Sequence, residues 1–424
     1  WHVHKTGARH FDGYRRQGRR MPVAVALGGD PVYTYAATAP MPDNMDEYLL
    51  AGFLRRRPVE LVRCLTCAIE VPADCDFVIE GYVDPAEEPA VEGPFGDHTG
   101  FYSLEDRYPR FHVTAVTHRR DALYPATVVG VPPEEDACIA RATERIFLAP
   151  IRLAVQPEVR DLWMPTAGTA HNLAVVSIER RYAGQAHKVA QALWGAGQMM
   201  FNKYLVVAGA GAAIRDTEVL ASLVRKADPT RDLVAAEGVL DVLDHATATA
   251  GFGGKLALDL TQAAARAEEP LHLPARFEPC GGVAAAATDW AASWRVLALF
   301  ADRATERVDA AAFFGRNPVQ GVKLAVLLDR EAEGLTGEEL LWLAAADTDP
   351  RRDVVLRDGT LAVDARGKRP GAPGHPARFP NPVVSDEATI AKVDARWDEY
   401  GLGAFVASPS RRYRVLLRSD GAAW

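Results

Sequence analysis

The chain has 424 residues, of which 48% are apolar, and its formal net charge is −8 at pH 7. This length favours two or three domains with well-filled cores, and the negative charge leaves no broad basic face for nucleic acid, so the Arg55–Arg57 run is interpreted as solvated surface. No apolar run approaches the ~20 residues of a membrane span, and the five cysteines indicate reduced thiols in a cytoplasmic protein.

The first 136 residues are predicted to form a β-rich domain. The chain starts at Trp1, in mid-pattern and without a signal peptide, so we expect residues upstream of it in the natural protein. Apolar stretches at 21–29, 76–83 and 110–119, separated by Gly, Pro and Asp, indicate strands. One helix is predicted between Met45 and the stop at Pro58, because apolar residues recur there at helical spacing.

From Ala137 onward the pattern changes to helices that alternate with apolar strands. The stretches "CIARATERIFLAPIRLAV" and "AHKVAQALWGAGQMMF" indicate helices, and "NLAVVSIERR" and "KYLVVAG" indicate strands. Strand, helix and strand in this order predict a parallel α/β sheet.

This α/β pattern is repeated about 121 residues later. Asp228-Pro229-Thr230-Arg231-Asp232 has its echo in Asp349-Pro350-Arg351-Arg352-Asp353, and each follows a similar apolar strand. We interpret the echo as a degenerate tandem duplication, although a charged turn with proline can also recur by chance. A Pro/Gly-rich loop then precedes a last helix, for which Ser385 and Glu387 suit the start. The predicted domains are 1–136, 137–265, 266–384 and 385–424.

The loop "EGPFGDHTGFY", from Glu92 to Tyr102, holds two carboxylates five residues apart around Gly-Pro and Gly. Glycine lets the backbone bend sharply, so that Glu92 and Asp97 can converge on one cavity. Two close carboxylates raise each other's pKa, and one of them can then be a proton donor at neutral pH. The alternative is a surface turn with solvated acids.

Further residues have the spacing of ligands. His2 and His4 share a face of an extended segment, and Glu47 on the following helix offers an oxygen, so these residues are candidates for a metal site. Cys64 and Cys67 are interpreted as packing residues, because residues i and i+3 of a strand point to opposite faces.

Two lysines are candidates for ligand binding. Lys203 enters a buried strand, and a lysine at the end of a parallel strand can point into a ligand crevice; a capping surface lysine is the alternative. Gly251–Lys255 ("GFGGK") could wrap a phosphate with backbone amides, or form an ordinary turn.

Seven stretches of the chain resemble, in the right order, the UbiD family of prenylated-flavin decarboxylases. They are "MPVAVALGGDP", "TAPMPDNMDEYLLAGFLR", "EVPADCDFVIEGYVDP", "EGPFGDHTGFYS", "YAGQAHKVAQALWGAGQMMFNKYLVV", "DVLDHATATAGFGGKLALD" and "ARWDEYGLGAFVASPSRRY". The doubled α/β unit is similar to the branch of menaquinone biosynthesis decarboxylases. The resemblance implies an α+β and α/β fold, with an N-terminal split β-barrel flavin-binding domain before the α/β domain and its degenerate copy.

The resemblance also implies roles for particular residues. Asp97 would donate the proton that replaces CO2 on the substrate, and Glu92 would hold the network beside the flavin. His4, or else His2, and Glu47 would hold a divalent metal, with Mn2+ as the first candidate and K+ as a further ion. Other positions would line the cofactor, namely Thr38, Ala39, Pro40 and Lys203, or the substrate pocket, namely His98 and Phe252.

Two departures from the family pattern bear on these roles. The asparagine and arginine of the family lie upstream of Trp1, so part of the flavin site is expected outside this sequence. Lys323 stands in a different context from Lys203, so the second copy is interpreted as structural.

The resemblance therefore implies a prenylated-FMN decarboxylase of an aromatic acid, with dihydroxynaphthoate of menaquinone biosynthesis as the first substrate. Another aromatic acid, of the 4-hydroxybenzoate type, and a non-catalytic assembly subunit are the alternatives. The implied partners are a flavin prenyltransferase that supplies the cofactor and further copies of the chain.

Overall fold

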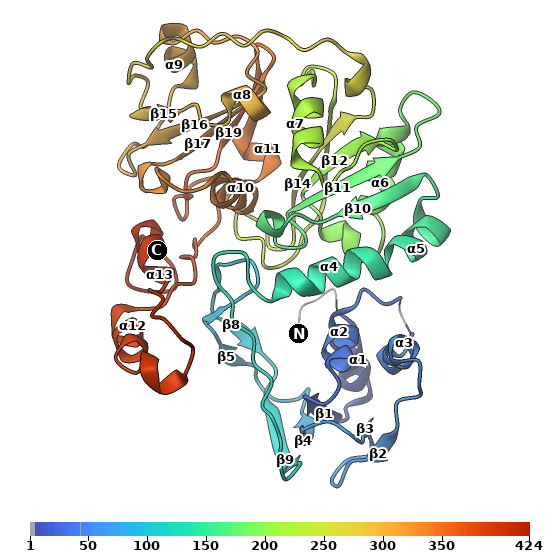
Figure 1. Ribbon diagram of the computed structural model, residues 1–424. Helices are drawn as coiled ribbons and strands as arrows, with labels where there is room; N and C mark the ends of the chain where they lie inside the picture. Colours follow the sequence, from blue (N-terminus) through green and yellow to red (C-terminus); the bar gives the residue numbers. More distant parts are fainter. Residues whose placement is uncertain (1–4, 43) are drawn as a thin grey trace. The chain divides into compact units, whose positions relative to one another are not determined.

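The computed structural model describes residues 5–42 and 44–424, which divide into two compact units (Figure 1). Unit 1 comprises the described residues up to Phe95 together with residues 104–128, and unit 2 comprises residues 96–103 and 129–424. The division falls within the loop that begins at Glu92, so that Glu92 belongs to unit 1 and Asp97 to unit 2. No described helix combines the length and the apolar character that a bilayer crossing requires.

Unit 1 is built around a three-stranded antiparallel sheet in the order β1-β4-β9. Its strands are β1 (Met21–Leu27), β4 (Phe77–Val83) and β9 (Phe111–His118), and they confirm the three predicted strands. Two antiparallel ribbons add β2 (Leu61–Arg63) with β3 (Glu70–Pro72) and β5 (Ala90–Glu92) with β8 (Asp106–Tyr108). Closure of these strands into a split barrel stays a prediction.

The described residues of unit 1 form three helices, where the sequence predicted one. They are α1 (Thr6–Gln17), α2 (Pro31–Thr38) and the predicted helix, α3 (Glu47–Arg55). The prediction missed α1 because this helix is polar on average and none of its residues is fully buried, so that its few apolar residues were not recognised. It missed α2 although Asp30 caps the backbone N–H of Val32 and Pro31 takes the first helical position, which are start signals.

The first sheet of unit 2 has five strands in the order β10-β11-β12-β14-β13. The three central strands run parallel and the two edges antiparallel, which makes the predicted parallel sheet a mixed one. The central strands are buried on both faces and therefore read as continuous apolar runs. Their bounds are β10 (Val159–Trp163), β11 (Leu173–Ile178), β12 (Tyr204–Gly209), β13 (Leu233–Val239) and β14 (Phe252–Leu260).

The second sheet repeats the first in strand order and strand direction, as β15-β16-β17-β19-β18. Even the charged turns match: the backbone N–H of Asp228 donates to the carboxylate of Asp232 over 2.8 Å, and that of Asp349 donates to Asp353 over 2.8 Å. The predicted repeat of the α/β pattern is confirmed, and its origin by tandem duplication stays a prediction. The strands are β15 (Ala285–Ala287), β16 (Val296–Ala301), β17 (Leu324–Asp329), β18 (Val354–Arg357) and β19 (Thr360–Asp364).

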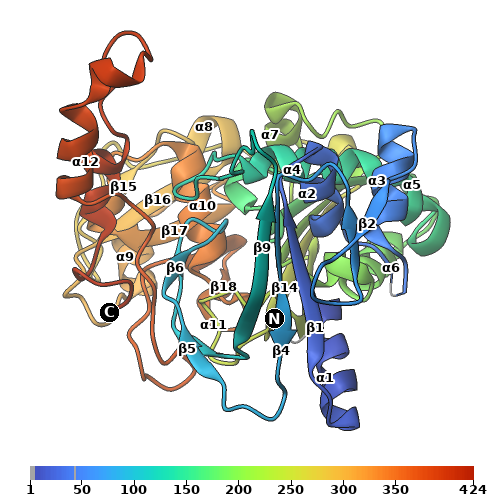
Figure 2. The same cartoon turned by 90° about the horizontal axis from the view of Figure 1, so that it is seen from below.

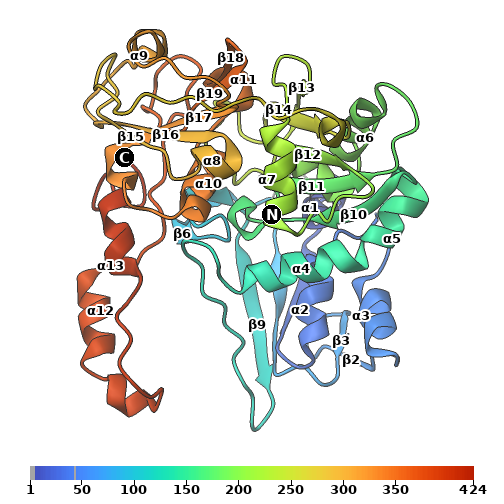
Figure 3. The same ribbon diagram turned by 45° about the horizontal axis from the view of Figure 1, so that its top comes forward.

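Helices cover the faces of both sheets and bury their apolar sides in separate cores. In Figures 1 and 3, α7 and α8 lie side by side where the two sheets meet, and α11 packs against β14 of the first sheet. The helices are α4 (Asp136–Ile146), α5 (Leu148–Pro150), α6 (Gln185–Trp194), α7 (Thr217–Arg225), α8 (Ala291–Trp294), α9 (Ala310–Arg316), α10 (Gly337–Ala346) and α11 (Pro350–Asp353).

The C-terminal part of unit 2 carries α12 (Glu387–Asp394) and α13 (Ser410–Tyr413) after the predicted Pro/Gly-rich loop. Figure 2 shows α12 at the end of an arm that leaves the rest of this unit. The last predicted helix is confirmed, but its cap is Asp386, whose side chain accepts from the backbone N–H of Thr389 over 2.6 Å, and not Ser385. Two short strands, β6 (Phe95–Gly96) and β7 (Tyr102–Ser103), border the loop around Asp97.

Candidate active site

The part of the loop that lies in unit 2 is fixed by its aromatic and small residues. Phe101 is 2% exposed, stacks on Trp342 with 4.8 Å between ring centroids, and meets the ring of His245 at 4.4 Å. The indole N–H of Trp342 donates to the carbonyl of Thr99 over 2.8 Å. Gly100 has φ +83°, and a Cβ there would lie 2.8 Å from the carbonyl oxygen of Gly130, so only glycine fits. These contacts hold Asp97 and His98 in place.

Asp97 and His98 form a hydrogen-bonded pair. The carboxylate Oδ1 of Asp97 accepts from the backbone N–H of His98 over 2.7 Å and lies 3.0 Å from the His98 Nδ1. Burial alone would raise the pKa of Asp97, but the hydrogen bond and charge of His98 outweigh it and the pKa is lowered. Burial alone would lower the pKa of His98, but Asp97 outweighs it and the pKa is raised. The raised carboxyl pKa expected from the sequence is wrong for Asp97.

His171 contacts this pair and was missed by the sequence analysis. Its ring lies edge-on to that of His98, with 5.2 Å between centroids, and its Nε2 is buried with no hydrogen-bond partner among the described residues. Burial, reinforced by the charges of His98 and Lys203, lowers the pKa of His171 to about 4 against the opposing effect of Asp241 and Asp244. His171 is therefore neutral at physiological pH and presents an unsatisfied ring nitrogen.

Lys203 lies immediately before β12 and is fully buried. Its Nζ pairs with the Asp244 carboxylate at 2.6 Å and donates to the carbonyls of Thr348 over 2.8 Å and Ala346 over 3.3 Å. The surface-lysine alternative is therefore wrong. Lys203 stands at the amino end of its strand, whereas ligands of open α/β sheets usually bind at the carboxyl ends.

Gly251–Lys255 is not a phosphate-wrapping loop, because β14 begins at Phe252 and includes Lys255. The backbone N–H of Gly254 donates to Asp349 over 2.9 Å, and the Lys255 Nζ donates to the carbonyls of Met200 over 2.7 Å and Asn202 over 2.6 Å. Burial, followed by the charge of Lys203 and against Asp244, lowers the pKa of Lys255 to about 7. The segment thus supplies a second buried amine beside the first.

One segment between β13 and β14 links these groups. Asp241 acts electrostatically on Asp97, His98 and His171, and Asp244 binds Lys203. The next residue, His245, lies 2.8 Å from Asp347 through its Nε2. The sequence analysis did not single out Asp241, Asp244 or His171, although charged residues that flank predicted buried strands were a usable signal.

The remaining predicted residue of unit 2 is Phe252. It opens β14, faces Val239 across the β13–β14 pair and is 40% exposed. An exposed aromatic ring can serve as an apolar wall for a substrate, but its place in a substrate pocket stays a prediction.

Unit 1 holds the other predicted site residues. Glu92 ends β5, is exposed and faces Asp106 across the ribbon. Thr38 ends α2 and its hydroxyl donates to the Tyr35 carbonyl over 2.8 Å, while Ala39 is buried and Pro40 half-buried. Glu47 is exposed in the first turn of α3, and α3 packs against α2. His2 and His4 lie outside the described residues, and convergence of Glu92 with Asp97 stays a prediction.

Cys64 and Cys67 were interpreted as packing residues on a strand. The packing is confirmed, because Cys64 is buried in a core of unit 1 and Cys67 packs against that core, but the strand is wrong. β2 ends at Arg63, so both cysteines lie on the turn that follows, and their sulfur atoms and a carboxylate oxygen of Glu80 lie within 4.8 Å of one another.

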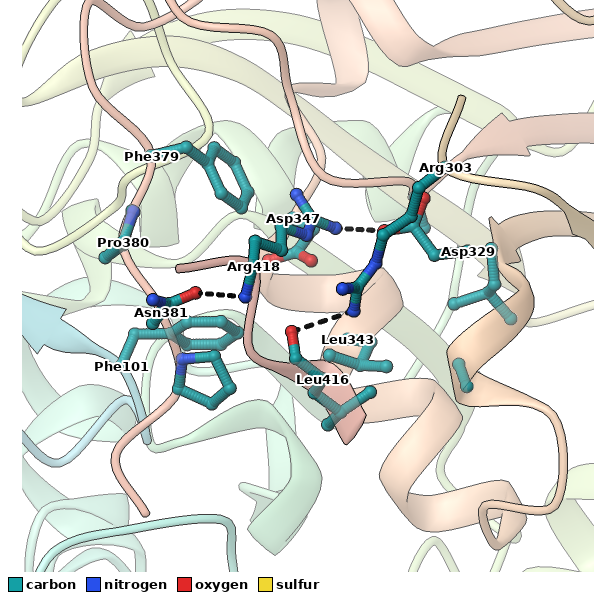
Figure 4. A pocket seen from close by; sticks show the side chains of 14 residues that line it. Phe101, Arg303, Asp329, Leu343, Asp347, Phe379, Pro380, Asn381, Leu416 and Arg418 are labelled. Carbon is teal, nitrogen blue, oxygen red and sulfur yellow. Dashed lines mark hydrogen bonds and ion pairs between the residues drawn. The ribbon is translucent and has the colours of Figure 1, made fainter. Parts of the chain in front are cut away.

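Unit 2 also contains a narrow cavity of about 20 Å³, bounded on one side by Phe101 and Asp347 (Figure 4). Arg303 and Arg418 cross its wall: Arg418 pairs with Asp329, and Arg303 donates to the carbonyl of Leu416 over 3.0 Å. This volume admits about one water molecule, whereas ligand pockets are usually several hundred Å³. The cavity is therefore not the space for an aromatic acid.

The comparison with protein families matches two adjacent segments of the chain. Residues 1–132 match the 3-octaprenyl-4-hydroxybenzoate carboxy-lyase Rift-related domain of UbiD, and residues 137–260 match the C-terminal domain of the same carboxy-lyase. Together the two matches cover more than half of the chain.

Curated relatives are similar over the same part. A protein of Aquifex aeolicus is 49% identical over 262 residues, which are 62% of this chain and 54% of that protein. A protein of Archaeoglobus fulgidus is 45% identical over 265 residues, 62% of this chain and 55% of that protein. Both are described only as uncharacterized proteins, and the chain spans about half the length of these relatives.

Solved structures share the fold. The UbiD-class enzyme HmfF of Pelotomaculum thermopropionicum, in complex with FMN, is 30% identical with a TM-score of 0.54, over 62% of this chain and 58% of that one. The vanillic acid decarboxylase of Sedimentibacter hydroxybenzoicus in its closed form is 25% identical with a TM-score of 0.57, over 61% of this chain and 55% of that one.

Proposed function

We propose that this chain, which belongs to the UbiD family, removes the carboxyl group of an aromatic acid as CO2 with the help of prenylated FMN. The observation that carries the proposal is the half-buried Asp97–His98 pair, which lies against a neutral His171 and near two buried lysines. Loss of CO2 must be followed by delivery of one proton to the same carbon. A carboxylate–imidazole pair that holds one proton at neutral pH is suited to this step.

The buried groups of unit 2 are compatible with a polar, anionic cofactor. His171 offers a buried ring nitrogen that lacks a partner, and such atoms in proteins are normally satisfied. Lys203 has no free N–H group for direct binding of a phosphate, because its three N–H groups already contact Asp244, Thr348 and Ala346. We propose that Lys203 and Lys255 act through their positive potential rather than as direct phosphate ligands.

When bound, prenylated FMN would share the negative charge that departure of CO2 leaves on the aromatic ring. The chain has three tasks. The lysines attract the anionic groups, Phe252 offers an apolar wall for the substrate ring, and the Asp97–His98 pair gives up its proton. His98 regains the proton from solvent, to which its side chain is 29% exposed.

Unit 1 is proposed to contribute the cofactor and metal residues that the resemblance implies. Thr38, Ala39 and Pro40 would line the flavin, and Glu92 would support the acid. A divalent metal, with Mn2+ first, would take the Glu47 carboxylate together with His4, since both are ligand types that suit such an ion. K+ is the further ion proposed.

The proposed substrate is a dihydroxynaphthoate of menaquinone biosynthesis, with an acid of the 4-hydroxybenzoate type as the alternative. The doubled α/β unit supports the first, because it is the feature in which the sequence resembles that branch, and the two sheets do repeat one strand order. A flavin prenyltransferase is proposed as the cofactor supplier, and self-association of the chain is expected. The HmfF and vanillic acid decarboxylase structures support the reaction class.

The test is co-expression with a flavin prenyltransferase, an absorbance spectrum of the purified protein, and CO2 release measured over naphthoates and benzoates. We expect release from a dihydroxynaphthoate at a higher kcat/KM than from 4-hydroxybenzoate. A protein that shows the cofactor spectrum but releases no CO2 from any acid would contradict the proposal. That result would favour the alternative that the chain is a non-catalytic assembly subunit.

A further inference from the structure

We propose that Cys64, Cys67 and Glu80 of unit 1 bind one Zn2+ ion at a site separate from the decarboxylation chemistry. Among the described residues these three form a group whose two sulfur atoms and carboxylate oxygen lie within 4.8 Å of one another. The two cysteines lie on the turn after β2, and Glu80 lies on β4. Two thiolates and one carboxylate are a ligand set that zinc accepts.

Hydrogen bonds from the turn after β2 hold the Glu80 carboxylate beside the two cysteines. Glu80 is 1% exposed, and its carboxylate accepts from the backbone N–H of Leu65 over 2.9 Å, the backbone N–H of Thr66 over 2.6 Å and the Thr66 hydroxyl over 2.8 Å. The turn that carries both cysteines is thus wrapped around a buried carboxylate.

This buried charge has no cationic partner in the described part of the chain, where Glu80 forms no ion pair with a lysine, arginine or histidine. Buried charges in proteins are normally paired or coordinate a metal. The two neighbouring thiols cannot supply a positive charge, but as thiolates they can bind one. A divalent cation between the three groups would compensate the charge of Glu80 and bind both sulfur atoms.

Both thiols lie in or against the interior of unit 1, since Cys64 is buried and Cys67 half-buried. Binding of Zn2+ would displace both thiol protons to solvent and leave a centre with charge −1 instead of the −3 of the bare ionised ligands. Cys75 is buried in the same hydrophobic core as Cys64 and donates its S–H to the carbonyl of Pro72 over 3.0 Å, so it is not counted among the ligands.

The ligand chemistry separates this site from the metal site that the resemblance implies. Thiolates select zinc and other soft or borderline cations over Mn2+, which prefers oxygen. Three protein ligands leave a fourth tetrahedral position, which a water molecule can occupy on the half-buried side at Cys67. A Cys64–Cys67 disulfide is the rival outcome, but it would leave the charge of Glu80 without compensation.

The experiment uses Co2+ as a spectroscopic probe on protein purified under reducing conditions. One equivalent should give a near-ultraviolet band of thiolate-to-cobalt charge transfer, and Zn2+ should abolish it by displacement. Cys67→Ser should lose the band and weaken Zn2+ binding by more than about 100-fold, because a direct ligand matters at least as much as its supporting residues. Cys138→Ser, at an exposed cysteine of α4, is the matched control and should keep both.

X-ray absorption spectroscopy at the zinc edge of the unaltered protein needs no variant. It therefore tests the inference even if the Cys67→Ser protein fails to fold. It should show two sulfur neighbours at about 2.3 Å from the metal. The inference is overturned by absence of the cobalt band, by a band that survives Cys67→Ser, or by mass spectrometry that finds a Cys64–Cys67 disulfide in metal-free protein. None of these results depends on decarboxylase activity.

Discussion

The two sheets of unit 2 have the same topology but differ sharply in the chemistry at equivalent positions. Lys203 and Lys323 each precede the second parallel strand, and the carbonyl of each accepts from the third: from Leu256 over 3.0 Å and from Leu361 over 2.9 Å. Lys203 and Lys323 are therefore equivalent in position, and the different context expected for Lys323 lies in its surroundings. Their surroundings differ, because Lys203 is fully buried with Asp244, whereas Lys323 pairs at 2.8 Å with Glu269, which is 45% exposed.

The difference arises in the connection between the last two strands. In the first sheet residues 240–251 join β13 to β14 and carry Asp241, Asp244 and His245. In the second sheet only Asp358 and Gly359 join β18 to β19. One scaffold thus supports a charged cluster in one copy and a tight turn in the other, as expected if function resides in loops grafted on a common fold.

The largest effect is expected at the acid beside the first sheet. Asp97→Asn removes the carboxylate that keeps His98 protonated and should lower the rate of CO2 release by roughly 10²–10⁴-fold. The flavin should remain bound, which an absorbance spectrum checks. Asp358→Asn, in the tight turn of the second sheet, is the control and should change the rate less than twofold. Equal losses in both variants would contradict the functional difference between the sheets.

The paired lysines test the same contrast through stability. Lys203→Met leaves Asp244 buried without its partner and should destabilise the fold by about 3–5 kcal/mol. Lys323→Met breaks a pair that is open to water on one side and should cost at most about 1 kcal/mol. Thermal and urea denaturation measure both variants. Equal losses would show that burial does not distinguish the two positions.

The pH dependence of turnover tests whether His98 holds the proton of the pair. The raised pKa of His98 means that it stays protonated below its ordinary value of 6.5 and loses the proton as pH rises through the higher value. Turnover should therefore fall on the alkaline side of pH 6.5, while the lowered pKa of Asp97 keeps the pair intact down to acid pH. His98→Gln should reduce kcat by roughly 10–100-fold and remove this alkaline limb. A limb unchanged in the variant would assign the proton to another group.

The smallest predicted effect concerns a contribution of the second repeat. Trp342 of α10 holds the carbonyl of Thr99, so Trp342→Phe should keep the ring stack with Phe101 but lose the hydrogen bond. A buried unsatisfied carbonyl costs about 1–3 kcal/mol. Denaturation should show this loss, and kcat should fall while KM for the acid changes little. Trp290→Phe, at a tryptophan packed against the same core, is the control for loss of an indole N–H elsewhere.

Strand and helix patterns predicted much of the fold, since burial leaves its period in the chain. The strands β11, β12, β16 and β17 were recognised because parallel strands covered on both faces are continuously apolar. The repeat of the α/β pattern was recognised from its charged turns, whose hydrogen bonds are local. Helix α1 was missed because it is polar on average and none of its residues is fully buried.

The features of the candidate site also fall into those that local sequence predicted and those that only the structure shows. By itself the sequence determined the family resemblance, the acid at Asp97 and the buried strand that follows Lys203, because each depends on neighbouring residues in the chain. Only the tertiary structure decided that His171 lies against His98, that Asp244 neutralises Lys203, and that Glu80 meets Cys64 and Cys67. These contacts join residues that are far apart in sequence. Packing and desolvation determine which charges are buried together, and no local sequence pattern records either.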